Sequence, residues 1–142
     1  MSEDTISRRR VSRFLHENAD RGYEAVNLHG GEATIRRDFL EILDEIHELG
    51  YPTIFLQTNA RKLARMAFAQ QVVARGVSLF IVSLHGASAA VQDGISLARG
   101  SFDQAVAGIR NVKDLGCKVR TNTVVCKDNF TELPEIADLC VG

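Results

Sequence analysis

The sequence predicts an α/β fold in which helices alternate with the strands of a parallel sheet. A glycine that ends a helical segment is followed by an apolar, β-branched segment four times, and these glycines are Gly22, Gly50, Gly76 and Gly116. The segments between them carry apolar residues at helical spacing. Near-continuous apolar strands separated by helices indicate parallel βα units with right-handed crossovers, either in a doubly wound sheet or in part of a (β/α) barrel.

Each expected element follows from its own pattern. Two helices, 39–49 and 102–115, have a sharply one-sided apolar face, whereas 5–20 and 61–75 are less sharply patterned. In the first helix we expect Val11, Phe14 and Leu15 to face inward, and the third helix runs through Met66 and Val73. The expected strands are 24–28, 53–56, 79–84 and 118–125, and a last helix begins near residue 132.

Length and composition indicate one ordinary globular domain. The chain has 142 residues, of which 45% are hydrophobic and 25% charged. We divide it into a leading helix, 1–21, and four βα units, 22–142. A net charge of -1 provides no general field for nucleic acid or an anionic membrane. No apolar run approaches the ~20 residues that span a bilayer, and the acidic start lacks signal-peptide character, so we expect a cytoplasmic protein.

The cysteines and histidines do not predict a metal site. Cys117, Cys126 and Cys140 are 9 and 14 residues apart and form neither a disulfide framework nor a compact ligand loop. His29 and His85 fall at strand ends that we expect to be neighbours, but a third ligand is missing. We therefore assign no metal ligand in this sequence.

The turn Gly30-Gly31-Glu32 ends the first strand and is the strongest candidate for a ligand site. Two glycines allow positive φ and bring backbone groups close to a ligand, because no Cβ intervenes. The Glu32 carboxylate suits an ammonium group. The alternative is an ordinary βα connection with an exposed glutamate.

Polar residues end the other strands as well. They are Gln57-Thr58-Asn59, Ser83-Leu84-His85-Gly86 and Arg120-Thr121-Asn122-Thr123. Both candidate folds bind ligands at the carboxyl ends of their strands, so these ends are expected to converge on one rim. Alternatively, individual Thr and Asn residues here form turns or cap helices. No glycine-rich phosphate loop occurs, so nucleotide binding of that kind is not predicted.

Five ordered blocks resemble the core of the radical S-adenosylmethionine (radical SAM) enzymes across residues 20–142. The blocks are Gly30-Gly31-Glu32-Ala33 with Arg36 and Asp38-Phe39-Leu40, then Gln57-Thr58-Asn59-Ala60, Ser83-Leu84-His85-Gly86, Gly100-Ser101-Phe102 through Gly108-Ile109-Arg110, and Thr121-Asn122-Thr123-Val124-Val125. The resemblance implies a partial (β/α)6 TIM-like barrel that is truncated at both ends and holds about strands two to five.

The resemblance implies cofactors and contacts. Gly30, Gly31 and Glu32 would hold the amino end of S-adenosylmethionine. The other implied contacts are Thr58 and Asn59 beside the cofactor, Ser83 near its ribose or carboxylate, Asn122 as a polar contact, Arg99 at the methionine carboxylate, and Arg120 at a substrate or cofactor anion. Strand alternation puts Arg120 and Asn122 on one face and Thr121 and Thr123 on the other, and it leaves open which face is inward.

The sequence also departs from the family pattern. Ala33 replaces a usual proline and Ala60 a usual glycine, so each position is expected to lose a preferred backbone shape. The C-x-x-x-C-x-x-C loop that ligates the family's [4Fe-4S] cluster is absent. The resemblance implies a cluster that takes one electron from a donor and passes it to S-adenosylmethionine. The electron splits the sulfonium carbon–sulfur bond and gives a 5′-deoxyadenosyl radical, which abstracts hydrogen from substrate.

Two interpretations follow from the missing loop. The first is an incomplete radical SAM enzyme whose ligands lie on lost sequence, so that this chain alone is inactive and its catalytic residues and substrate stay unassigned. The alternative is a non-catalytic α/β binding or scaffolding module. In either case, open sheet edges predict possible self-association.

Overall fold

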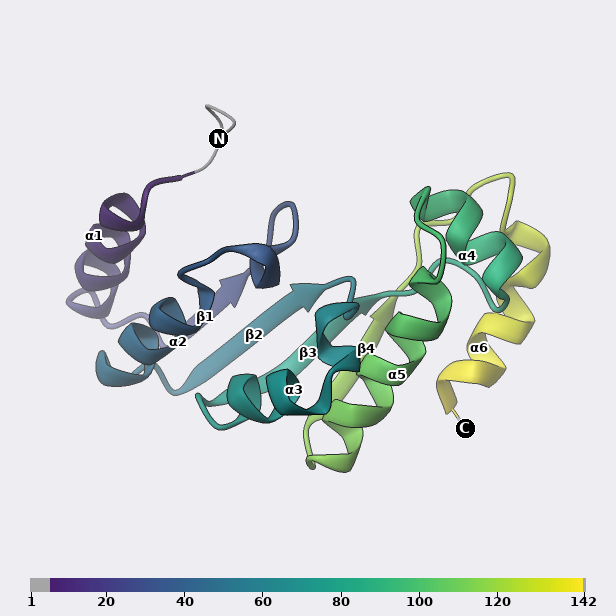
Figure 1. Ribbon diagram of the computed structural model, residues 1–142. Coiled ribbons are helices and arrows are strands. Elements are labelled where there is room, and N and C mark those ends of the chain that lie inside the picture. The colour runs from purple at the N-terminus through teal and green to yellow at the C-terminus, as the bar shows by residue number, and fades with distance from the viewer. Residues whose placement is uncertain (1–5, 142) are drawn as a thin grey trace.

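The computed structural model describes residues 6–141 and contains one four-stranded parallel sheet. The strands are β1 (Ala25–Leu28), β2 (Thr53–Thr58), β3 (Val77–Ser83) and β4 (Lys118–Asn122). Each pairs in parallel with its successor, in the order β1-β2-β3-β4 (Figure 1). The order never reverses, as it would at the switch point of a doubly wound sheet. The α/β class is therefore confirmed, and the open sheet is consistent with part of a barrel.

Among residues 6–141, six helices flank this sheet. They are α1 (Arg8–Ala19), α2 (Phe39–Glu48), α3 (Met66–Val73), α4 (Ala89–Ser96), α5 (Ser101–Asp114) and α6 (Leu133–Val141), with 3₁₀ turns at Ala33–Ile35, Lys62–Ala64 and Phe130–Glu132. Figure 1 shows α2, α3 and α5 along one face of the sheet, α1 at one end of the molecule, and α4 and α6 at the other. Within residues 6–141, none of these helices is long and apolar enough to cross a membrane.

The core lies between the sheet and the helices that cover it. Ile54 and Leu56 of β2 and Phe80 and Val82 of β3 are almost completely buried on this side. The alternate residues of both strands point to the other face and are only partly buried. Consequently, in the part of the chain that the structure describes, the sheet has one face packed by helices and one helix-free face.

Several sequence predictions need correction. The helix expected at 61–75 is split into a 3₁₀ turn and α3, because Arg65 between them has extended backbone with φ -86° and ψ 107°. Phe14, expected to face inward, is 64% exposed because α1 packs chiefly on α2 and buries Leu15 there. β4 ends at Asn122, before the exposed Val124 and Val125. Helix α4 was not predicted.

The unpaired sides of β1 and β4 border the sheet in the part of the chain that the structure describes. An unpaired strand edge offers backbone N–H and C=O groups to another chain. Self-association through these edges therefore stays a prediction.

Close packing fixes the loop after β2. Ala60 is fully buried and has φ +59°, so it adopts the left-handed conformation that the usual glycine would have there, contrary to the expected loss of backbone shape. Helix α5 passes directly over this loop at Gly108. A Cβ atom at Gly108 would lie 2.3 Å from the Ala60 carbonyl oxygen. Gly108 thus allows α5 to contact the loop that carries Thr58 and Asn59.

We expect Gly108→Ala to lower the free energy of unfolding by about 1–3 kcal/mol, because the added methyl must displace backbone in a packed core. Gly94→Ala in α4 is the matched control, since a Cβ there meets no atom within 4 Å. That substitution should raise the free energy of unfolding by roughly 0.5–1 kcal/mol. Urea unfolding of the three proteins measures both changes, and equal stabilities for the parent and Gly108→Ala would contradict the packing argument.

Candidate functional site

The glycine turn after β1 has the backbone shape that the sequence predicts. Gly30 has φ +88° and Gly31 φ +51°, and both residues are exposed. A Cβ atom at either position would meet no atom within 4 Å, so side chains are excluded here by backbone conformation rather than by neighbouring protein atoms. The turn therefore presents free backbone surface at the carboxyl end of β1.

The Glu32 carboxylate joins this turn to the end of β2. Its Oε1 atom accepts hydrogen bonds from Thr34 N at 3.2 Å, Thr34 Oγ1 at 2.7 Å and Thr58 Oγ1 at 2.7 Å. Its Oε2 atom accepts one from Asn59 N at 2.7 Å. The residue is half-buried. Glu32 is thus a bonded link between two strand ends and not a freely exposed side chain.

Thr34 and Lys62 support Glu32 and were missed in the sequence. Thr34 is 1% exposed, and its carbonyl oxygen accepts a hydrogen bond from Lys62 Nζ at 2.7 Å. The Lys62 ammonium also lies 4.7 Å from the centre of the Phe68 ring, a cation–π contact. The only sequence signal for Thr34 is its place two residues after an acidic residue that caps a short helix.

Thr58 and Asn59 are brought to Glu32 as neighbouring residues of one turn. Thr58 is 3% exposed, and its hydroxyl oxygen also accepts a hydrogen bond from Ala60 N at 3.0 Å. Asn59 Oδ1 accepts one from Arg61 N at 3.0 Å, which is the turn-forming role considered as the alternative. Direct contact of these two side chains with a cofactor stays a prediction.

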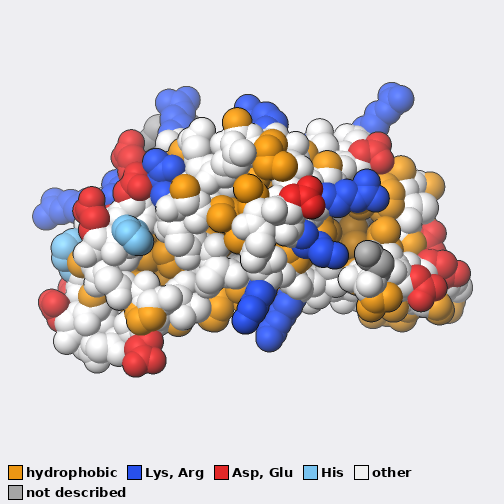
Figure 2. All heavy atoms as spheres, turned by 90° about the horizontal axis from the view of Figure 1, so that it is seen from below, with side chains coloured by type: hydrophobic (Ala, Val, Ile, Leu, Met, Phe, Trp, Pro, Cys, Tyr) orange, Lys and Arg blue, Asp and Glu red, His pale blue; other side chains and the backbone are white. Residues whose placement is uncertain are grey.

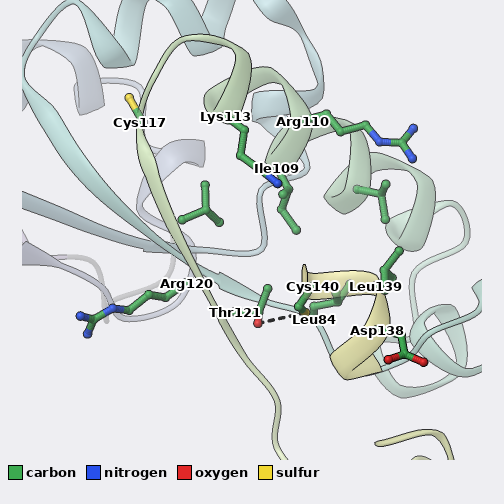
Figure 3. Close-up of a pocket in the computed structure, with 12 residues that line it drawn as sticks. Leu84, Ile109, Arg110, Lys113, Cys117, Arg120, Thr121, Asp138, Leu139 and Cys140 are labelled. Atoms are coloured by element: carbon green, nitrogen blue, oxygen red, sulfur yellow. Dashed lines mark hydrogen bonds between the residues drawn. The ribbon is translucent and has the colours of Figure 1, made fainter. Parts of the chain in front are cut away.

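Strand register places the remaining rim residues of β3 and β4. Ser83 is the register partner of Asn122, and Ile81 is the partner of Arg120. Ser83, Arg120 and Asn122 therefore share the helix-free face. In Figure 3, Thr121 points toward Cys140 of α6, with 3.2 Å between Oγ1 and Sγ, and Arg120 points the opposite way. The register of β4 against β3 therefore shows that Arg120 and Asn122 lie on the helix-free face of the sheet.

Arg99 lies apart from the Glu32 cluster. It is exposed in the connection between α4 and α5, and within residues 6–141 it forms no hydrogen bond or ion pair. The connection itself is fixed by Asp93, which accepts hydrogen bonds from Gly100 N, Ser101 Oγ and Phe102 N at 2.6–2.9 Å. The N–H groups of Phe102 and Gly100 hold the pKa of the Asp93 carboxyl below its usual range.

His85 connects the loop after β3 to the loop after β4. Its Nδ1 atom accepts a hydrogen bond from Val124 N at 3.2 Å, and its carbonyl oxygen accepts one from Asn129 Nδ2 at 2.8 Å. Partial burial lowers the pKa of the imidazole. The expectation that His29 and His85 occupy neighbouring strand ends is wrong, because β2 separates β1 from β3.

The described residues do not fit an iron–sulfur cluster. Within residues 6–141, no group of three or more His, Cys, Asp and Glu side chains is arranged to hold a metal ion. Cys117, directly before β4, and Cys140, in α6, are both half-buried, and burial raises the pKa of the Cys117 thiol. Thiol protonation opposes metal ligation, which requires the thiolate.

Among the grooves on the described surface, two bear on the predicted site residues. The larger, of about 720 Å³, lies between α5, β4 and α6 (Figure 3), and Figure 2 shows hydrophobic side chains in a hollow bordered by Lys and Arg. Of the predicted site residues it includes only Arg120, whose side chain points away. The smaller groove, of about 460 Å³, is lined by His29, Gly30, Gly31 and Glu32 with residues of α1 and α2. Of these two grooves, the smaller is thus the one that contains the predicted glycine turn, on the side of α1 and α2.

Comparison with known proteins agrees with the motifs and the fold. Residues 3–140 match the family model described as the radical SAM superfamily. The chain belongs to the radical SAM superfamily. Its relatives in this superfamily are enzymes that use S-adenosylmethionine and a [4Fe-4S] cluster.

Three relatives show how far the similarity extends. A probable GTP 3′,8-cyclase from Saccharolobus islandicus is 33% identical over 119 residues, which are 83% of this chain and 38% of that protein. One from Sulfurisphaera tokodaii is 27% identical over 99% of this chain and 44% of its own length. The mycofactocin maturase MftC from Mycolicibacterium smegmatis is 34% identical over 80% of this chain and 29% of that protein. The chain thus spans less than half the length of these relatives.

We expect the free energy of unfolding to fall as the pH decreases below 6.5, because His85 is protonated more readily in the unfolded chain than in the folded one. Above pH 6.5 the imidazole is mostly neutral in both states, so its contribution is then fully present. Urea unfolding at pH 7.5 and 5.5 measures the effect, with His85→Asn as the comparison because the Asn carbonyl can replace Nδ1 as an acceptor. Equal losses of stability in both proteins would contradict the assignment to His85.

Proposed function

We propose that the Gly30-Gly31-Glu32 turn binds the amino-acid end of S-adenosylmethionine, as part of a radical SAM enzyme. The observation that carries the proposal is the uneven bonding of the Glu32 carboxylate. Among the described residues, Oε1 accepts three hydrogen bonds and Oε2 accepts one. A carboxylate oxygen with free lone pairs is suited to a charge-assisted hydrogen bond from the ligand ammonium.

The other predicted rim residues complete the proposal. Ser83 and Asn122 share the helix-free face, where we assign them to the ribose or carboxylate region of the same ligand. Arg120 lies two residues before Asn122 and is assigned to an anionic group of the cofactor or substrate. Arg99 is assigned to the methionine carboxylate, supported by its exposed place directly before Gly100, in the connection that Asp93 fixes.

The described residues bind and orient the ligand in this proposal. When bound together, S-adenosylmethionine and a [4Fe-4S] cluster supply the 5′-deoxyadenosyl radical that abstracts hydrogen from substrate. The sequence contains no three-cysteine loop, so we assign the cluster ligands to segments outside this chain and expect the chain by itself to be inactive. A one-electron donor is a further partner of the complete enzyme.

We expect Glu32→Ala to weaken S-adenosylmethionine binding by on the order of 1.5–3 kcal/mol, the range for hydrogen bonds to charged groups. Ser83→Ala removes a neutral hydroxyl and should cost about 1 kcal/mol. Isothermal titration calorimetry of the parent and both variants measures these differences. Glu41→Ala removes an exposed carboxylate from α2 and is the matched control.

Two outcomes would contradict the proposal. The first is equal affinity of the parent and Glu32→Ala for S-adenosylmethionine, and the second is no binding to the parent chain. Glu32→Ala leaves the hydroxyls of Thr34 and Thr58 without their acceptor and is expected to lower the stability of the fold. Each titration is therefore run at a temperature below the unfolding transition of the variant. Thermal unfolding of every variant establishes that temperature.

A further inference from the structure

We infer that Thr34 and Thr58 are positioning residues, which hold Glu32 Oε1 so that Oε2 is aimed at a ligand ammonium. The inference rests on the proposed function of the glycine turn. It assigns to Thr58 a role through Glu32 in place of the direct cofactor contact that the family resemblance implies. It also adds Thr34, which no sequence motif identified.

The Thr58 hydroxyl is fully occupied by hydrogen bonds within the protein. A hydroxyl has one proton to donate, and that of Thr58 goes to Glu32 Oε1 at 2.7 Å. The hydroxyl oxygen accepts from Ala60 N at 3.0 Å. Because the residue is also only 3% exposed, its hydroxyl has neither a proton nor an approach path for a ligand.

The polar groups of Thr34 are likewise occupied by hydrogen bonds within the protein. Both its backbone N–H and its hydroxyl donate to Glu32 Oε1, and its carbonyl oxygen accepts from Lys62 Nζ. With 1% of its surface exposed, Thr34 cannot contact a ligand in the groove. Lys62 in turn anchors Thr34 from the loop after β2, so the carboxylate is held from both strand ends.

The consequence is a carboxylate whose orientation is fixed before a ligand arrives. A free glutamate loses side-chain rotational freedom when it forms a hydrogen bond, and this loss reduces affinity. Three donors on Oε1 remove most of that freedom in the folded protein. Oε2, with one donor from Asn59, is left to bind the ammonium. The threonines therefore raise affinity only for ligands that carry this group.

A double-mutant cycle on the full chain tests this inference. S-Adenosylmethionine affinity is measured by calorimetry for the parent, Thr58→Val, Glu32→Ala and the double variant. We expect Thr58→Val to weaken binding about tenfold, because the less constrained Glu32 side chain must then lose rotational freedom when the ligand binds. In the Glu32→Ala background the same change should have no effect. Thr58→Ser, which keeps the hydroxyl, should bind within about twofold of the parent.

Two further measurements separate positioning from general damage. 5′-Methylthioadenosine contains the adenosine and sulfur but lacks the amino-acid group, so its affinity should be the same for the parent and Thr58→Val. Thr53→Val, at the other end of β2, is the matched control and should bind S-adenosylmethionine as the parent does. If Thr58→Val does not fold, Thr34→Val takes its place in the same cycle, because it also removes a hydroxyl donor from Glu32 Oε1, and the same dependence on Glu32 is expected.

The outcomes distinguish this inference from the proposed function. If Glu32→Ala weakens S-adenosylmethionine binding and Thr58→Val does not, the positioning role is overturned and the proposed function stands. If Thr58→Val weakens binding equally with and without Glu32, Thr58 acts by another route and the inference is also overturned. Equal affinity of the parent and Glu32→Ala overturns the proposed function itself.

Discussion

The hydrogen-bonded carboxylate of Glu32 is the interaction on which the candidate site depends. It connects the turn after β1 to the turn after β2 through contacts that span 26 and 27 residues of sequence. A half-buried carboxylate with four donors is stable in this environment because the donors replace the water it loses. The bonds from Thr58 and Asn59 set the distance between the two strand ends, and all four bonds together fix the direction of the remaining lone pairs. Structure and ligand recognition therefore depend on one side chain.

The packing beneath the site keeps those strand ends in place. Ala60 accepts a left-handed backbone, which costs a non-glycine residue roughly 1–2 kcal/mol, and the contact with Gly108 of α5 holds it there. Its N–H group donates to Thr58 Oγ1, so the strained residue is itself part of the hydrogen-bond network around Glu32. Backbone strain next to a candidate site persists only where packing determines it. The position of α5 is thus linked to the geometry of the carboxylate.

The loops after β3 and β4 form a second, separate network. Asn129 is fully buried and bonds the carbonyl groups of His85 and Val124, while Glu132 accepts hydrogen bonds from Ala87 N and Ser88 Oγ. These contacts hold the last described helix against the rim. They leave Ser83 and Asn122 on the helix-free face, where neither side chain bonds to another residue among 6–141. The rim therefore combines a tightly bonded half at β1 and β2 with a less bonded half at β3 and β4.

The sequence by itself determined the α/β class, the four strands, the helices α2 and α5, and the left-handed glycines of the first turn. These features depend on the spacing of apolar residues and on the backbone preference of glycine, and both can be read within a short segment of sequence. Only the tertiary structure decided the break at Arg65, the exposure of Phe14, the face of β4 that carries Arg120, and the partners of Glu32. Each of these depends on which element packs against which, and the bond from Lys62 to Thr34 crosses 28 residues. Such a contact leaves no periodic signal in the chain, because its energy comes from burial and strand register established only after folding.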